Sequence, residues 1–306
     1  MRLIAPVDAG TFVRDHWEQR PLRIARGDPA FHDGLLSLAD LDGLLSHASI
    51  RAPDIRILRD GKETPVRELT GEAQNAHVGR LEAVYAAYRD GATISMQALN
   101  ERHPPLAALC RSLALELSAR FQVNAYLTPA DARGLSIHYD THDVFVLQVE
   151  GSKRWHLYDS PVRLPTRRQP FRRGDADLGA PVESFVLERG DTLYLPRGVV
   201  HSAESGSATS LHLTVGAYPV TWAGLLRGAL EAAIEEDAAL RQSLPPGFAL
   251  RPAERAAAER RLGELIRGLA ARWDAPTLIG DAAETALAPP RRASRGISST
   301  SRRRRR

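Results

Sequence analysis

The chain has 306 residues, of which 43% are hydrophobic and 25% charged, a composition typical of a globular protein with a buried core. No apolar run approaches the roughly 18–20 residues of a membrane span, and the single cysteine, Cys110, excludes an intrachain disulfide and a thiolate zinc cluster. These features predict a cytoplasmic protein that does not associate with membranes.

The net charge of +4 is distributed unevenly. From Arg291 onward the tail RRASRGISSTSRRRRR holds eight arginines and no acid, so that without them residues 1–290 carry a net charge of about −4. A terminal peptide of this composition is typical of a disordered segment, and we expect at most weak, nonspecific contact with nucleic acid through it.

The first hundred residues mix short helical and extended patterns. Residues 37–48, SLADLDGLLSHA, predict a short helix with Ser37 as its N-cap. Residues 54–66, DIRILRDGKETPV, predict two strands joined by a turn at Asp60-Gly61. Residues 104–121, PPLAALCRSLALELSARF, begin with two prolines and repeat apolar residues at helical spacing, which predicts a helix with one buried face.

After Phe121 the pattern changes to short apolar segments that end in Gly, Pro, Asp or Ser, as expected for a sandwich or barrel of strands. Residues 149–155, VEGSKRW, predict a compact hairpin with Gly151 in its turn. Beyond Pro219 the pattern returns to amphipathic helix in two stretches, residues 221–244 and 252–273.

The predicted fold class is therefore α+β, with a jelly-roll (double-stranded β-helix, or cupin) core, an amino-terminal α/β flank and a carboxy-terminal helical pair. The expected organisation is a flank at residues 1–100, the barrel at 101–219, a helical region at 220–285 and a disordered arginine-rich tail at 286–306.

A candidate metal site lies in residues 134–159, GLSIHYDTHDVFVLQVEGSKRWHLYD. His138, Asp140 and His142 stand at alternate positions, so in an extended segment all three side chains share one face. His201, after the Pro-Arg-Gly turn of residues 196–198, supplies a ligand from a distant strand. Two imidazoles and one carboxylate, here His138, Asp140 and His201, form the facial triad of non-haem Fe(II) oxygenases.

Four segments carry a resemblance to a known family: NAYLTP, HYDTHDVFVLQVEGSKRWHLY, GDTLYLPRGVVHSAES and SLHLTVGAY. Together with FVRDHWEQRPLRIAR near the amino terminus, they resemble the JmjC-type cupin oxygenases, in particular the ribosomal oxygenase branch. The similarity covers roughly residues 10–220. It implies hydroxylation of a side chain on a protein or peptide, with Fe(II), 2-oxoglutarate and O2 as cofactor and cosubstrates, and a ribosomal protein as the family-level substrate.

The resemblance also implies roles for individual residues. His138, Asp140 and His201 match the iron ligands, and Lys153 matches the lysine that binds the distal carboxylate of 2-oxoglutarate. Polar groups beside the cosubstrate are matched by Asn124, Tyr126 and Thr214. In relatives the helical pair helps to form a homodimer, which the amphipathic helices of this chain permit, although packing against the barrel would use the same apolar faces.

Alternatives remain open from the sequence. His142 has the same face parity as His138 and Asp140 and is an alternative ligand, although the family places other residues there. His212 is predicted to be an interior histidine whose ring nitrogens are hydrogen-bonded. The whole chain is alternatively a metal-binding cupin with non-oxidative activity, or a non-catalytic module that binds RNA or ribosomes through its arginine tail.

Overall fold

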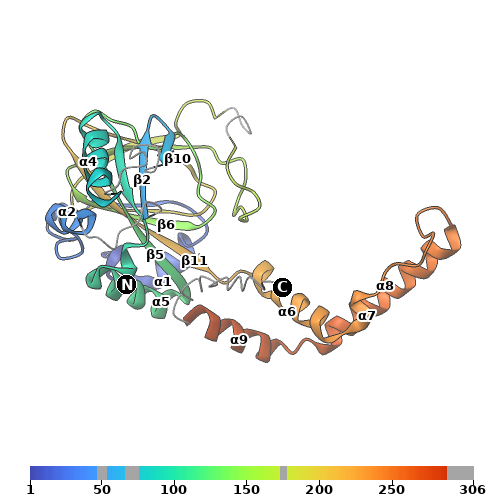
Figure 1. Ribbon diagram of the computed structural model, residues 1–306. Coiled ribbons are helices and arrows are strands. Elements are labelled where there is room, and N and C mark those ends of the chain that lie inside the picture. The colour runs from blue at the N-terminus through green and yellow to red at the C-terminus, as the bar shows by residue number, and fades with distance from the viewer. Residues whose placement is uncertain (47–53, 66–75, 173–177, 288–306) are drawn as a thin grey trace, which may run out of the picture. The chain divides into compact units, whose positions relative to one another are not determined.

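The computed structural model describes residues 1–46, 54–65, 76–172 and 178–287 (Figure 1). The chain divides into two compact units, Met1–Pro219 and Val220–Arg306. None of the helices within the described ranges is both long and apolar enough to cross a membrane. The residues of the arginine-rich tail from 288 onward and His47 of the first predicted helix lie outside these ranges.

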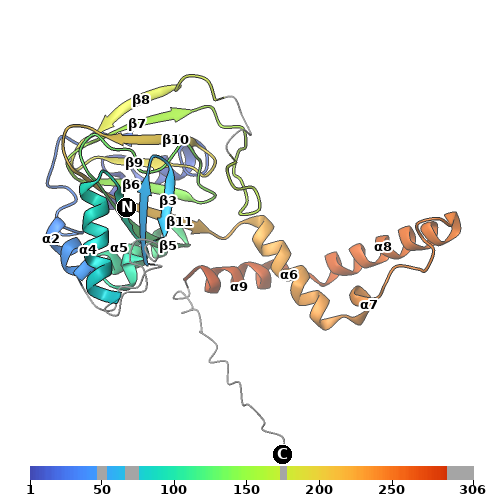
Figure 2. The same ribbon diagram turned by 45° about the horizontal axis from the view of Figure 1, so that its top comes forward.

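The larger sheet of the first unit contains eight antiparallel strands in the order β1-β9-β6-β11-β5-β4-β2-β3 (Figures 1 and 2). Their bounds are β1 Leu22–Ile24, β2 Ile55–Arg59, β3 Lys62–Pro65, β4 Thr93–Met96, β5 Ala119–Thr128, β6 Asp143–Glu150, β9 Thr192–Leu195 and β11 Ser210–Pro219. Strands of the amino-terminal hundred residues thus extend the same sheet as strands of the barrel region. The predicted turn at Asp60-Gly61 is confirmed, since it joins β2 to β3.

The smaller sheet has the order β10-β7-β8, with bounds β7 Lys153–Tyr158, β8 Glu183–Leu187 and β10 Val200–Ser205. Its inner face packs on the larger sheet through one apolar cluster, contributed by β6, β9, β7 and β8: Val144, Val146, Leu193, Leu195, Trp155, Leu157, Phe185 and Leu187. Two sheets that face each other in this way form a jelly-roll, and the predicted α+β fold class is confirmed.

Helices cover the other face of the larger sheet. Their bounds are α1 Ala9–Asp15, α2 Leu38–Ser46, α4 Ala76–Arg89 and α5 Pro104–Leu117, with short 3-10 turns η1 Arg2–Ile4 and η3 Leu99–Glu101. Phe145 and Leu147 of β6 belong to the same buried cluster as residues of α1, α2 and α5. Strand β6 is therefore buried on both faces, which explains its nearly continuous apolar sequence. The predicted cap of α2 is confirmed, because Ser37 Oγ accepts a hydrogen bond from the Asp40 amide.

The predicted hairpin around Gly151 is wrong. Strand β6 pairs with β11 and β9, whereas β7 pairs with β10 and β8, so the turn carries the chain from one sheet to the other. Gly151 has φ +61, and a Cβ at this position would meet the carbonyl oxygen of Thr209. The glycine marks a tight turn correctly, but a turn signal does not specify which strands become neighbours.

The second unit is helical, with α6 Trp222–Glu236, α7 Ala238–Arg241, α8 Pro252–Arg272 and α9 Ala275–Leu287. The sequence predicted α6 and α8, but not the break between α6 and α7 or the helix α9. Asp237 causes the break, since its side chain accepts a hydrogen bond from the Ala239 amide and caps α7. At the start of α9, the Asp274 carboxylate likewise accepts a hydrogen bond from the Thr277 amide. Aspartate is a typical N-cap residue, so this helix start could have been recognised in the sequence.

Candidate metal centre

Three predicted ligands converge between the two sheets. His138 and Asp140 lie on the irregular segment that connects β5 to β6, and His201 is the second residue of β10. The His138 and His201 backbones form a bridge, with the His138 amide donating to the His201 carbonyl at 3.1 Å and the His201 amide donating back at 2.8 Å. This bridge fixes the distance between two residues that are 63 positions apart in the sequence.

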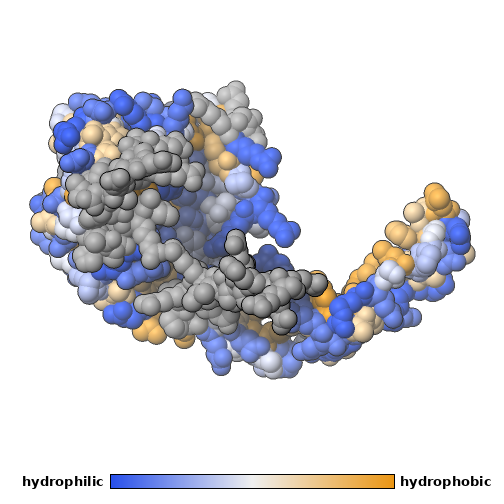
Figure 3. Space-filling model, in the orientation of Figure 1, coloured by the Kyte–Doolittle hydropathy of each residue, from blue (hydrophilic) through white to orange (hydrophobic). Residues whose placement is uncertain are grey.

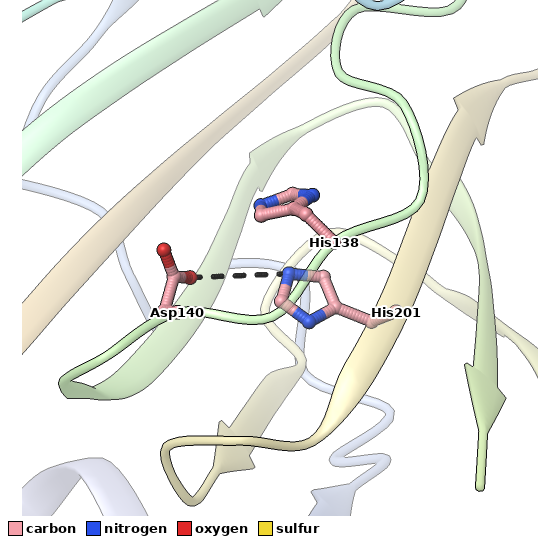
Figure 4. A group of neighbouring side chains, drawn as sticks. All are labelled: His138, Asp140 and His201. Atoms are coloured by element: carbon pink, nitrogen blue, oxygen red, sulfur yellow. Dashed lines mark ion pairs between the residues drawn. The ribbon is translucent and has the colours of Figure 1, made fainter. Parts of the chain in front are cut away.

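The three side chains present their donor atoms to a common point (Figure 4). One ligand atom from each residue lies within 4.8 Å of the others. His201 Nε2 lies 4.0 Å from Asp140 Oδ2, and the rings of His138 and His201 are 4.5 Å apart between centroids. Two imidazole nitrogens and one carboxylate at this spacing form a three-ligand site that leaves positions on a metal open.

Backbone carbonyls orient both imidazoles. His138 Nδ1 lies 2.8 Å from the Ser136 carbonyl, and His201 Nδ1 lies 2.9 Å from the Val199 carbonyl. Because a carbonyl only accepts, each Nδ1 carries the proton and each Nε2 is left bare for a metal. Burial, reinforced by the neighbouring His138, lowers the pKa of His201 to about 4, so its imidazole is neutral near pH 7.

Asp140 is the carboxylate of this group. Its burial alone would raise its pKa, but the adjacent imidazoles of His138, His142 and His201 lower the pKa below its ordinary value. The carboxylate is therefore ionised, which is the form that binds a metal.

His142 lies beside the group without joining it. Its ring stacks on Tyr218 at 4.8 Å with an interplanar angle of 17°. The ring also lies over Gly216, where an added Cβ would approach His142 Cδ2 to 2.8 Å. The structure thus brings together His138, Asp140 and His201, and places His142 on the pocket wall.

The three residues line a cavity of about 360 Å³. The other site residues predicted from the sequence line the same cavity, namely Lys153, Asn124, Tyr126 and Thr214. Strands β5 and β11 are paired here, with Asn124 opposite Thr214 and Tyr126 opposite His212. Residues opposite each other in a sheet project to the same side, so these pairs form one wall of the cavity.

Lys153 places a buried side-chain amine in this cavity. It is only 4% exposed, and its Nζ donates to Thr128 Oγ1 at 2.9 Å. No carboxylate among the described residues forms an ion pair with it, and burial lowers its pKa to about 7. A buried ammonium without an anionic partner is costly, so this position suits the carboxylate of a ligand.

Among the cavity-lining residues that sequence reasoning did not assign to the site, two carry a buried nitrogen without a hydrogen-bond partner in the described part of the chain. His212 is 4% exposed, and its Nδ1 has no hydrogen-bond partner among the described residues, so the prediction of a fully hydrogen-bonded interior histidine is wrong. Trp155 Nε1 is likewise buried without a partner in that part of the chain. Both follow from strand alternation, since His212 is two residues before Thr214 and Trp155 two residues after Lys153.

The neighbourhood of His212 keeps its imidazole neutral. Its ring stacks on Tyr126 at 5.0 Å and 4°, and Trp155 meets it edge-on at 5.9 Å. Burial, followed by the nearby positive charge of Lys153, holds the pKa of His212 well below its ordinary value. Burial likewise raises the pKa of Tyr126, which keeps its phenol protonated. Besides the metal-ligand group, the cavity is therefore lined by several neutral hydrogen-bonding groups, by Lys153, and by Arg56, whose guanidinium pairs with Glu63.

The sequence is similar to known proteins over most of its length. Residues 100–225 match the JmjC domain. Ribosomal oxygenase 2 of Rattus norvegicus is 34% identical over 279 residues, which cover 88% of this chain and 58% of the rat protein. Ribosomal oxygenase 1 of Gallus gallus is 36% identical over 254 residues, covering 79% of this chain and 41% of the chicken protein. The chain thus spans about half the length of these curated relatives.

Solved structures agree in fold. The structure of YcfD, a ribosomal oxygenase from Escherichia coli in complex with cobalt and 2-oxoglutarate, has a TM-score of 0.56 and 21% sequence identity, covering 94% of this chain and 72% of YcfD. A second crystal structure of the Escherichia coli ribosomal oxygenase YcfD has a TM-score of 0.54 and 23% identity, covering 85% and 67% of the two chains. These structures agree with the chain in fold alone. The JmjC match at residues 100–225 and the curated relatives show that the chain belongs to the JmjC-domain family and is similar in sequence to the ribosomal oxygenases.

Proposed function

We propose that this chain is an Fe(II)- and 2-oxoglutarate-dependent oxygenase that hydroxylates a side chain of a protein or peptide. The observation that carries the proposal is the combination of the His138–Asp140–His201 group with the buried, unpaired Lys153 in one cavity. A three-ligand metal group alone, or a buried lysine alone, is compatible with other functions. The two in one cavity suit a bound metal together with a dicarboxylate ligand.

The donor set fits these groups chemically. Two bare imidazole nitrogens and an ionised carboxylate suit Fe(II) while leaving positions for further oxygen ligands. The charges also balance, because the dianion of 2-oxoglutarate and Asp140 offset a divalent metal and Lys153, and because Arg56 on the cavity wall is already paired with Glu63. Balance matters in a buried site, where an uncompensated charge costs several kcal/mol.

The roles of the residues follow from this arrangement. His138, Asp140 and His201 would hold the metal, which when bound supplies O2 activation coupled to oxidative decarboxylation of 2-oxoglutarate. Lys153 would bind the distal carboxylate, and Thr128 orients its ammonium group. Asn124, Tyr126 and Thr214 would shape the cosubstrate pocket, and the buried walls exclude water from it.

The substrate we propose is a polypeptide, and a ribosomal protein is the first candidate to test. The support comes from the names of the relatives, which are ribosomal oxygenases or, in Drosophila persimilis, a lysine-specific demethylase and histidyl-hydroxylase. We further propose a cytoplasmic homodimer, formed through apolar stripes on the helices of the second unit. Nucleic-acid contact through the arginine tail stays a prediction.

The test measures 2-oxoglutarate binding and its conversion to succinate by anaerobically Fe(II)-loaded protein after exposure to O2. We expect Asp140→Ala to abolish turnover, and Lys153→Ala to weaken 2-oxoglutarate binding by tenfold or more, since a charge-assisted hydrogen bond contributes about 1.5–3 kcal/mol. The matched control is Lys62→Ala, which removes the only other lysine of the chain, an exposed residue of β3.

The outcomes separate the hypotheses. Binding of 2-oxoglutarate that depends on Lys153 and not on Lys62, with succinate formation that depends on Asp140, would support the oxygenase. Metal binding without any affinity for 2-oxoglutarate would refute it and favour a cupin with non-oxidative activity.

A further inference from the structure

One ion pair of the first unit is buried on both sides. Asp143, the first residue of β6, is 0% exposed, and the side chain of Arg197, in the turn between β9 and β10, is 10% exposed. Arg197 Nη1 donates to Asp143 Oδ2 at 2.8 Å, and the Arg197 amide donates to Asp143 Oδ1 at 3.0 Å. The carboxylate thus holds both the side chain and the backbone of the turn.

The other ion pairs among the described residues lie nearer the surface. In each of them at least one partner is 25% exposed or more. Hydrophilic residues dominate much of the visible surface of the first unit (Figure 3). The Asp143–Arg197 pair differs from the rest in that both partners are largely removed from solvent.

A buried ion pair of this kind fixes geometry more than it adds stability. The desolvation of two charges offsets most of their attraction, so the net contribution to stability is small. Moving either partner away, however, leaves the other as an uncompensated buried charge, which is costly. The two segments that carry Asp143 and Arg197 are therefore held at a fixed spacing.

These two segments are the ones that carry the candidate metal ligands. Asp143 follows Asp140 by three positions, and Arg197 precedes His201 by four. Two backbone contacts join the same segments, namely the bridge between the two histidine ligands and a hydrogen bond from the Gly198 amide to the Asp140 carbonyl at 3.0 Å. The ion pair adds a side-chain contact where the ligand segment enters β6.

The ligand segment has little regular structure to hold it. Residues 139–142, which include Asp140, belong to no named strand and to no isolated β-bridge. Asp140 is positioned instead by its neighbours in the chain and by the hydrogen bond from the Gly198 amide. Because Arg197 directly precedes Gly198, the ion pair holds the turn at the place where this hydrogen bond forms.

The amino-terminal flank supports the pair from outside. Arg197 Nη1 also donates to Glu18 Oε1, and the Glu18 amide donates to the Tyr194 hydroxyl at 2.9 Å. The same hydroxyl lies 3.4 Å from Asp143 Oδ1. The guanidinium is therefore held between two carboxylates, one from the flank and one from the ligand segment.

We propose that Asp143 and Arg197 are positioning residues for the metal group, which hold Asp140 and His201 at the spacing that binds a divalent metal. This inference rests on the proposed function, because the group that the pair positions is the metal centre of that function. Neither Asp143 nor Arg197 is among the residues that line the cavity, so both act through the backbone segments that carry them.

The experiment compares the full chain with three variants at the pair. Arg197→Met removes the positive charge, and Arg197→Lys keeps it. Asp143→Asn/Arg197→Met removes both charges, so that no uncompensated buried charge remains to unfold the chain. The matched control is Arg102→Met, at an ion pair with Asp54 in the same unit that is 25% and 22% exposed and does not line the cavity.

Three quantities are measured for each protein. Calorimetry gives the Kd of Co²⁺ added alone to the metal-free protein, and then that of 2-oxoglutarate. The visible absorption spectrum of bound Co²⁺ reports the number and geometry of its ligands. Urea unfolding of the metal-free protein separates a change in folding stability from a change in the metal site.

We expect Arg197→Met and the double variant to raise the Kd of Co²⁺ about tenfold and to change its spectrum, while Arg102→Met changes the Kd less than about twofold. Arg197→Lys, which keeps a positive charge beside Asp143, should restore most of the affinity. The double variant should lose metal affinity even though it is more stable than Arg197→Met.

A folded double variant with the Co²⁺ affinity and spectrum of the wild type would overturn the inference and leave the proposed function standing. Equal weakening of Co²⁺ binding in Arg102→Met would also overturn it, because the effect would then be a general loosening of the unit. Co²⁺ binding that depends on the pair, in a protein without affinity for 2-oxoglutarate, would instead refute the proposed function and leave the positioning role intact.

Discussion

The buried Lys153 predicts a specific dependence of folding stability on pH. Its pKa in the folded chain is about 7, against an ordinary value of 10.5 that it regains on unfolding. Between these values the unfolded chain binds more protons than the folded chain, so folding stability rises with pH by up to about 1.4 kcal/mol per pH unit. The rise begins near pH 7 and ends near pH 10.5.

Urea unfolding of the metal-free protein at pH 7, 8 and 9 measures this effect. Lys153→Met should remove most of the rise between pH 7 and pH 9, because a neutral side chain of similar length has no proton to lose. Lys62→Met, at an exposed position, should leave the slope as in the wild type. A wild-type slope that Lys153→Met leaves intact would show that the ammonium is not desolvated in the folded chain.

A second prediction concerns the contribution of His212 to the proposed cosubstrate pocket. His212→Phe keeps a ring that stacks on Tyr126 but removes both nitrogens, including the unpartnered Nδ1. We expect calorimetry to show about tenfold weaker binding of 2-oxoglutarate with unchanged metal stoichiometry, because one hydrogen bond to an anion is lost. His156→Phe is the control, a histidine of β7 that instead lies 2.8 Å from Ser184 Oγ through its Nδ1. An unchanged affinity of His212→Phe for 2-oxoglutarate would show that His212 contributes only packing to the pocket.

The sequence located the metal group better than the rest of the pocket. His138 and Asp140 are two positions apart, and the structure brings their ligand atoms together with that of His201, although the segment that carries the first two lies outside the named strands. His212 and Trp155 obey strand alternation, yet a buried histidine or tryptophan is usually part of a core, so the sequence offered no reason to separate them from packing residues. Their role becomes visible only in the unsatisfied nitrogens that face one cavity.

At the scale of elements, the strands could be predicted and their partners could not. Local signals, namely alternation and turn residues, define β2, β3 and α5 in the chain. Whether β7 pairs with β6 or with β10 depends on contacts between distant residues, such as the bridge between His138 and His201. The break at Asp237 was missed because acidic residues are also common within exposed helices.

The turn at Gly151 can be tested as an element that links the two sheets. Gly151→Ala adds a Cβ at φ +61 and against the Thr209 carbonyl, so it should lower the free energy of unfolding by more than about 1–2 kcal/mol. Gly27→Ala is the matched control, because Gly27 has φ +65 and open space around it. The difference between the two variants in urea unfolding isolates the steric contact from the cost of the left-handed backbone. Equal losses would show that the turn relaxes away from Thr209.

At the scale of the whole molecule, the second unit leaves apolar surface that the proposed homodimer would cover. Leu226, Leu230 and Ile234 stand four residues apart on α6 and are 48%, 37% and 37% exposed. Leu262 and Ile266 form a similar stripe on α8, at 58% and 56% exposed. Side chains at this spacing form one face of a helix, and such a face is typical of a helix–helix interface.

Sedimentation equilibrium measures whether two copies associate through the α6 stripe. We expect the wild type to be a dimer at micromolar concentration and Leu226→Glu/Leu230→Glu to be a monomer, since two charges would be buried in an apolar interface. Glu231→Ala, on the polar side of the same helix, should stay dimeric. Circular dichroism must show unchanged helix content, so that dissociation is not confused with unfolding. A folded double variant that still dimerises would exclude α6 as the interface, and a monomeric wild type would contradict the homodimer itself.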